Sequence, residues 1–146
     1  MGHIEATKDL SAAPEELWAI ISDPQTWDKW FTVHDKWLDE PPATLTQGAR
    51  LTAKIVMLNM ANKIEWTVKA VDAPASLALG GTGMAGVKAD FAFTIVPNGS
   101  GSTFTVSGDF EGALVKGALA KAVEKDGMRQ LDKTLQQLDQ LASAAV

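Results

Sequence analysis

Histidine is the side chain best suited to acid–base chemistry near neutral pH, and this chain contains only two. His3 lies near the N-terminus, and His34 follows a tryptophan-rich segment and precedes Asp35. His34 is therefore the weak candidate for a catalytic acid or base, although a single histidine beside a loop is more often a surface residue. The chain has no cysteine and no clustered metal ligands, so we expect no metal site and no cofactor.

Carboxylates in the middle of the chain alternate with aromatic residues. Glu65 precedes Trp66, and Asp90 precedes Phe91. Successive residues of a strand point to opposite faces, so if the aromatic residues point inward these carboxylates point outward. The same alternation turns Asp109 and Glu111 outward. Regular strands therefore place no acid–base pair inside the fold, although a β-bulge could reverse any one orientation.

Seven segments are predicted to be strands, one near the N-terminus with weak alternation and six in the middle of the chain, where residues 76–82 are less regular than the others. They are residues 3–10, 34–39, 50–58, 63–71, 76–82, 87–96 and 103–110. Asn98-Gly99 followed by Ser100-Gly101 is a strong hairpin signal, and tight turns between short strands favour an antiparallel meander. The glycine-rich segment Gly80–Gly86 is expected to form a flexible hairpin tip, which could gate the mouth of a pocket.

Helical signals flank this strand-rich region. Pro14 and Pro24 each suit a first helical position, and Asp23 can cap the second helix, so two short helices follow the first strand. The last ~30 residues change to a helical period. Their apolar stripe consists of Leu119, Val123, Gly127, Leu131, Leu135 and Leu138. Together these elements predict one α+β domain over residues 1–146, with an antiparallel sheet of about seven strands curved round a long C-terminal helix.

A curved sheet and a straight helix leave space between them, and that space is the natural place for a ligand. The residues predicted to line it lie on the inward faces of strands or at the start of the long helix. They are Ile55, Met57, Trp66, Phe91, Phe93, Phe110, Leu114 and Ala118. The same residue types equally suit an ordinary core between sheet and helix.

Four short segments carry a resemblance to a known family. Ala13–Trp18, Ser22–Pro24 and Trp27–Trp30 resemble the opening signature of the START-like (SRPBCC) superfamily, in particular its polyketide cyclase/dehydrase and lipid-transport branch. Gln47–Arg50 is similar to the glycine turn that begins the third strand of that family. The resemblance spans nearly the whole chain and implies a helix-grip fold with a hydrophobic cavity. It supplies no catalytic residue.

Three functions remain open at this point. The first is a carrier or sequestering protein that binds a lipid-like or polyketide-like molecule through apolar contacts. The second is a cyclase or dehydratase that uses the same cavity, for which the absence of tyrosine and the presence of only two arginines leave few groups to stabilise an enolate. The third is an interaction module that presents an apolar outer sheet face round Val56 and Leu58.

The net charge and the hydropathy of the chain limit the classes of binding partner. A net charge of −5 disfavours binding to nucleic acid, whose recognition is largely electrostatic. No apolar run approaches the ~20 residues that span a bilayer, so stable membrane insertion is not expected. The N-terminal segment lacks the pattern of a secretory signal, and we expect a cytoplasmic protein.

Overall fold

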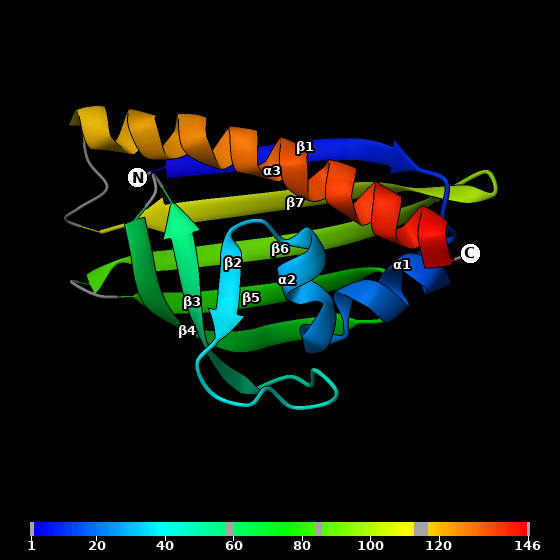
Figure 1. Ribbon diagram of the computed structural model, residues 1–146, viewed down its shortest axis with the longest axis horizontal. Coiled ribbons are helices and arrows are strands. Elements are labelled where there is room, and N and C mark those ends of the chain that lie inside the picture. The colour runs from blue at the N-terminus through cyan, green and yellow to red at the C-terminus, as the bar shows by residue number, and fades with distance from the viewer. Residues whose placement is uncertain (1, 58–59, 84–85, 113–116, 146) are drawn as a thin grey trace.

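The computed structural model describes residues 2–57, 60–83, 86–112 and 117–145, which form a curved sheet with a long helix along one side (Figure 1). The strands are β1 (Gly2–Leu10), β2 (His34–Trp37), β3 (Arg50–Met57), β4 (Met60–Asp72), β5 (Ser76–Gly83), β6 (Lys88–Asn98) and β7 (Gly101–Glu111). The helices are α1 (Pro14–Ile21), the 3-10 turn η1 (Pro24–Thr26), α2 (Trp27–Trp30) and α3 (Gly117–Ala145).

The seven strands form one antiparallel sheet in the order β1-β7-β6-β5-β4-β3-β2. Consecutive strands from β2 to β7 are neighbours, and β1 closes the sheet beside β7. The short helices α1 and α2 lie under the C-terminal half of α3 at one end of the sheet (Figure 1). This arrangement confirms the predicted α+β helix-grip fold.

Local signals explain the two short helices after β1. Pro14 begins α1, and the Glu16 carboxylate accepts a hydrogen bond from the backbone N–H of Ala13 at 3.3 Å. Asp23 caps the next segment by accepting from the N–H of Gln25 at 3.1 Å. The segment starts as the single 3-10 turn η1 before it continues as α2, so the predicted second helix has two parts.

Helix α3 packs along the edge of the sheet at β1. Its buried face includes Leu131, Leu135 and Leu138, as the apolar stripe predicts. Two side chains of α3 accept hydrogen bonds from the edge of β1. The N–H of His3 donates to the Glu124 carboxylate at 3.0 Å, and the N–H of Glu5 donates to the Met128 sulfur at 3.3 Å.

Strand β5 continues through Gly83, which confirms the strand predicted over residues 76–82 and shows that the predicted hairpin tip is wrong for Gly80–Gly83. Side chains from the neighbouring strand occupy the space above two of its glycines. A Cβ on Gly81 would lie 2.7 Å from the Trp66 ring, and a Cβ on Gly80 would meet the side chain of Lys69. Gly80 and Gly81 are therefore strand positions covered by larger neighbours, and residues 84–85 of the expected tip lie outside the residues that the structure describes.

A similar relation between a glycine and a ring on β7 gives a prediction for stability. A Cβ on Gly108 would lie 2.8 Å from the Phe91 ring, which is itself fully buried. We expect Gly108→Ala to lower the free energy of unfolding by about 1–3 kcal/mol, because Phe91 must shift within a packed core. Urea denaturation measures the change. Gly83→Ala is the matched control, because its Cβ would meet only ordinary contacts at 3.6 Å or more, and an equal loss there would contradict the explanation.

Candidate functional site

An irregularity in β2 turns His34 into the interior. The pairing of β2 with β3 shifts register between His34 and Lys36, so Asp35 is an extra residue in the strand. His34 lies opposite Ile55 and Trp37 lies opposite Ala53, and both of these partners are buried. The bulge thus brings two residues that are three positions apart onto the inner face.

His34 is buried, with 5% of its surface exposed, so the expectation of a surface histidine is wrong. Its ring centroid lies 4.4 Å from that of Trp37 and 6.1 Å from that of Trp27. Neither ring nitrogen has a hydrogen-bond partner. Burial lowers the pKa of His34 from 6.5 to about 4, while the negative charges of Asp28 and Asp35 act in the opposite direction.

This environment decides what His34 can do chemically. A pKa of about 4 leaves the imidazole neutral at pH 7 and makes it a weak base. The neighbouring carboxylate of Asp35 lies 3.6 Å from the ammonium group of Lys54, and no described carboxylate forms a hydrogen bond with the His34 ring. His34 can therefore donate and accept hydrogen bonds, but it lacks the orienting partner that a general base uses.

Most of the predicted lining residues are part of an aromatic core. Trp66, Phe91, Phe93 and Phe110 are at most 4% exposed, and Ile55 is 7% exposed. The centroid of the Phe91 ring lies 5.7 Å from those of Trp66 and Phe110, and Phe91 stacks on Phe93 with a centroid distance of 6.5 Å. The side chains of Met57 and Ala118, and the whole of Leu114, lie outside the residues that the structure describes.

The indole groups of this interior fall into two kinds. Trp27 donates its Nε1–H to the carbonyl of Ile21 at 3.0 Å. Trp30 and Trp37 also have acceptors, at 3.0 and 2.8 Å. The Nε1–H of Trp66 is buried without a partner. Since most buried polar groups are paired, the unpaired atoms of Trp66 and His34 stand out.

A polar junction between α3 and β3 was missed by the sequence reasoning. Gln130 donates to the carbonyl of Val56 at 2.9 Å and lies 3.4 Å from the carboxylate of Asp126, which also pairs with Arg129. Asp126 is only 7% exposed. Its spacing of three residues from Val123 places it beside the apolar stripe, which is the one signal that could have indicated a buried position.

The outer face of the sheet carries the carboxylates, as the alternation predicts. Glu65, Asp90 and Glu111 are exposed, and the Asp109 side chain is 49% exposed. Asp90 pairs with Lys69 at 2.8 Å. Asp109 pairs with His3 at 2.6 Å, and this hydrogen bond is the main cause that raises the pKa of His3.

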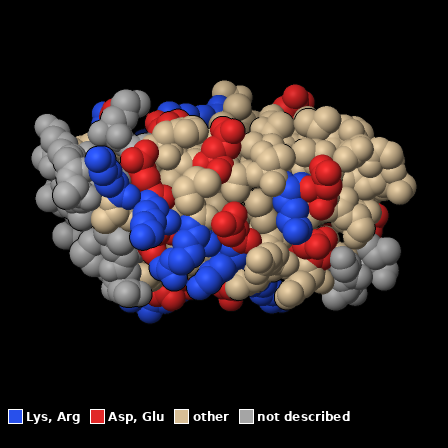
Figure 2. Space-filling view, turned by 90° about the horizontal axis from the view of Figure 1, so that it is seen from above, with Lys and Arg blue, Asp and Glu red and all other residues tan. Residues whose placement is uncertain are grey.

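The described part of the outer face near Val56 is basic. Lys54 lies opposite Lys36 on one side and Lys63 on the other, so three lysines follow one another across β2, β3 and β4. An apolar interaction patch round Val56 is therefore not seen among the described residues, and Leu58 lies outside them. On the side of the molecule where α3 lies, the surface shows basic side chains gathered beside acidic ones (Figure 2).

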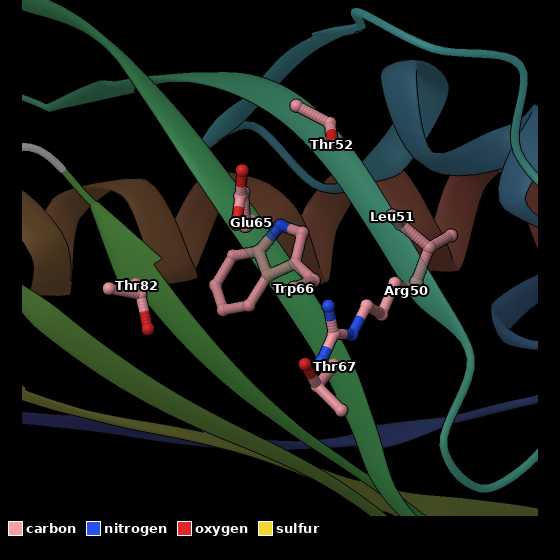
Figure 3. A pocket seen from close by; sticks show the side chains of 7 residues that line it. All are labelled: Arg50, Leu51, Thr52, Glu65, Trp66, Thr67 and Thr82. Atoms are coloured by element: carbon pink, nitrogen blue, oxygen red, sulfur yellow. The ribbon is translucent and has the colours of Figure 1, made fainter.

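The same outer face has an open hollow of about 300 Å³ across β3, β4 and β5 (Figure 3). It is lined by Arg50, Leu51, Thr52, Glu65, Trp66, Thr67 and Thr82. Most of these side chains are polar, whereas Leu51 and Trp66 are buried and belong to the inner face. The hollow is thus a different place from the predicted apolar site.

Neither a metal centre nor a membrane-spanning helix is found in the part of the chain that the structure describes. Its residues contain no group of three or more side chains that could hold a metal ion. They also contain no helix that is both long enough and apolar enough to cross a membrane.

The curved sheet and the helix along it define the class as a helix-grip protein with an aromatic interior. Residues 1–142 match the model of the family described as polyketide cyclase / dehydrase and lipid transport, and the chain belongs to this family. This result confirms the resemblance to START-like proteins.

Relatives of the chain occur in Mycobacterium tuberculosis. An uncharacterised protein, Rv1546, is 26% identical over 97% of this chain and 99% of its own length. A protein named toxin Rv0910 is 27% identical over 84% of this chain and 85% of its own length.

Solved structures show the same fold. A START superfamily protein from Mycobacterium smegmatis has a TM-score of 0.76 at 20% identity and covers 97% of this chain and 99% of its own. TTHA0849 from Thermus thermophilus has a TM-score of 0.78 at 17% identity, with 98% of both chains covered. DynU16, from the dynemicin biosynthetic locus, has a TM-score of 0.71 at 16% identity and covers 99% of this chain and 48% of its own.

Proposed function

We propose that this protein binds an apolar small molecule between the sheet and α3, as a carrier or sequestering protein. The observation that carries the proposal is the character of the inner sheet face. Five of the predicted lining residues lie on strands and have described side chains, and all five are buried and apolar: Ile55, Trp66, Phe91, Phe93 and Phe110. The described carboxylates of their strands face outward. Apolar contact is the main source of affinity in such a site.

The family and the low basicity of His34 support binding over catalysis. The family description includes lipid transport as well as polyketide cyclisation. A cyclase would need a group to move protons, and the pKa of His34, about 4, makes it poorly suited to that step near pH 7. Polyketide-like and lipid-like molecules are therefore both ligands to be tested, with the chain acting on neither.

Native mass spectrometry of the purified protein tests this function directly. The native mass is compared with the denatured mass, and any bound molecule is extracted and identified. A discrete lipid or polyketide that leaves on denaturation is the expected result. Failure to find a bound molecule, together with failure to take up the neutral fluorescent probe N-phenyl-1-naphthylamine, would remove the ligand-binding proposal.

A pair of substitutions on β3 locates the site. Ile55 faces the interior, and the adjacent Lys54 faces outward. We expect Ile55→Trp to weaken binding of N-phenyl-1-naphthylamine by about tenfold or more, because the larger ring takes up interior space. Lys54→Trp adds the same side chain on the opposite face and is expected to leave binding unchanged. Equal effects of the two substitutions would place the site outside the interior.

A further inference from the structure

The chemistry of His34 matches one kind of ligand group. A neutral imidazole presents one N–H donor and one nitrogen acceptor. In this protein neither nitrogen has a hydrogen-bond partner, and only 5% of the surface of His34 is exposed to solvent. A buried polar group without a partner destabilises the folded state, so an imidazole kept in this position calls for an explanation.

The position of the imidazole is closely defined. The bulge at Asp35 turns the side chain to the inner face, and the Trp27 and Trp37 rings lie at 6.1 and 4.4 Å from its centroid. Trp27 and Trp37 are themselves held by hydrogen bonds to backbone carbonyls, at 3.0 and 2.8 Å. Groups fixed in this way lose little side-chain entropy on binding and can discriminate between ligands.

We propose that His34 is the polar recognition residue of the interior site, and that the ligand is an apolar molecule carrying a hydroxyl group. An alcohol or phenol can donate to one heteroatom and accept from another, so it pairs with a neutral imidazole whichever nitrogen carries the proton. This inference rests on the proposed binding function and specifies the class of ligand.

Other ligand groups fit the site less well. A methyl ether can only accept a hydrogen bond, so it cannot satisfy an imidazole nitrogen that needs a donor. A carboxylate would bring a negative charge into an aromatic interior in which the imidazole is neutral, and burial of an unpaired charge is strongly unfavourable. The hydroxyl is therefore the best match in both hydrogen bonding and charge.

Four molecules of one shape test the inference: naphthalene, 2-naphthol, 2-methoxynaphthalene and 2-naphthoate. Each is titrated at pH 7 into the full-length protein, and displacement of N-phenyl-1-naphthylamine is measured. We expect 2-naphthol to bind about tenfold more tightly than 2-methoxynaphthalene, as one well-made hydrogen bond allows. His34→Phe should reduce that ratio to about one, because phenylalanine offers neither a donor nor an acceptor to distinguish the two molecules.

Two further variants separate recognition from a purely structural role. His34→Gln keeps a donor and an acceptor and should preserve part of the preference for 2-naphthol, whereas His3→Gln, at the exposed histidine, should preserve all of it. In wild type, 2-naphthol should shift the ring nitrogen resonances of His34 in ¹⁵N NMR, and 2-methoxynaphthalene should shift them less.

The possible outcomes distinguish the two proposals. If none of the four molecules displaces the probe and the probe itself does not bind, the proposed function fails. If they bind equally well, or if the preference for 2-naphthol survives His34→Phe, ligand binding stands and the role of His34 is overturned.

Discussion

Replacing Trp27 with alanine is expected to lower the free energy of unfolding by about 3–5 kcal/mol. Trp27 is fully buried, and its ring contacts those of five residues from α2, the residue that follows α2, β2 and β6. Truncation would leave a large cavity among side chains that cannot all move to fill it. Typical domains have about 5–15 kcal/mol of stability, so the change is a large fraction of the total. Guanidinium unfolding followed by circular dichroism measures it.

Trp27→Phe is the matched control. It keeps an aromatic ring but removes the Nε1–H that donates to the carbonyl of Ile21 at 3.0 Å. We expect it to cost less than the alanine substitution, since part of the packing survives. Equal costs for the two variants would show that the hydrogen bond, and not the packing, accounts for the contribution of Trp27.

The second large effect is a loss of stability in acid that depends on His34. Its pKa of about 4 in the folded protein is below the ordinary 6.5, so the unfolded chain binds an additional proton between these values. The part of the unfolding free energy that depends on a neutral His34 is therefore fully present above about pH 6.5 and is lost as the pH falls through about 4. The pKa difference corresponds to about 3 kcal/mol, and denaturation series at several pH values would measure it.

His34→Phe should remove this part of the pH dependence, because phenylalanine does not titrate and a similar ring fits between the tryptophans. The stability of the variant at pH 7 is expected to equal or exceed that of the wild type, since two unpaired buried nitrogens are removed. His3→Gln should keep the loss in acid. Asp109 raises the pKa of His3, so protonation of His3 stabilises the folded state, whereas protonation of His34 destabilises it. A pH profile left unchanged by His34→Phe would contradict the assignment.

Strand and helix patterns predicted the architecture because they repeat over many residues. In β4, the alternation of Ile64, Trp66 and Val68 with charged and polar residues gave the correct inward face, and it also placed Glu65 outside. In α3, the apolar stripe identified the buried leucines. Such signals are local, and each depends on a period that the backbone imposes.

The burial of His34 was not predictable in the same way. It depends on one bulged residue, Asp35, and on rings from Trp27 and Trp37, which the chain brings together from separate elements. Gly80 and Gly81 fell within two overlapping predictions, the strand over residues 76–82 and the hairpin tip over residues 80–86, and the local sequence could not decide between them. Gly81 looks like part of a turn until the Trp66 ring of the neighbouring strand is seen to occupy the space above it.

The docking of α3 on β1 also bears on self-association. β1 is a sheet edge of nine residues, and its outward N–H groups at His3 and Glu5 are occupied by Glu124 and Met128 of α3. A movement that lifted α3 from this edge would present a template on which a strand of a second molecule could pair. The helix that covers the interior thus also protects this edge of the sheet from pairing with a second molecule. A ligand that entered on the β3 side of α3 would leave the helix in place on β1, and the edge would stay covered.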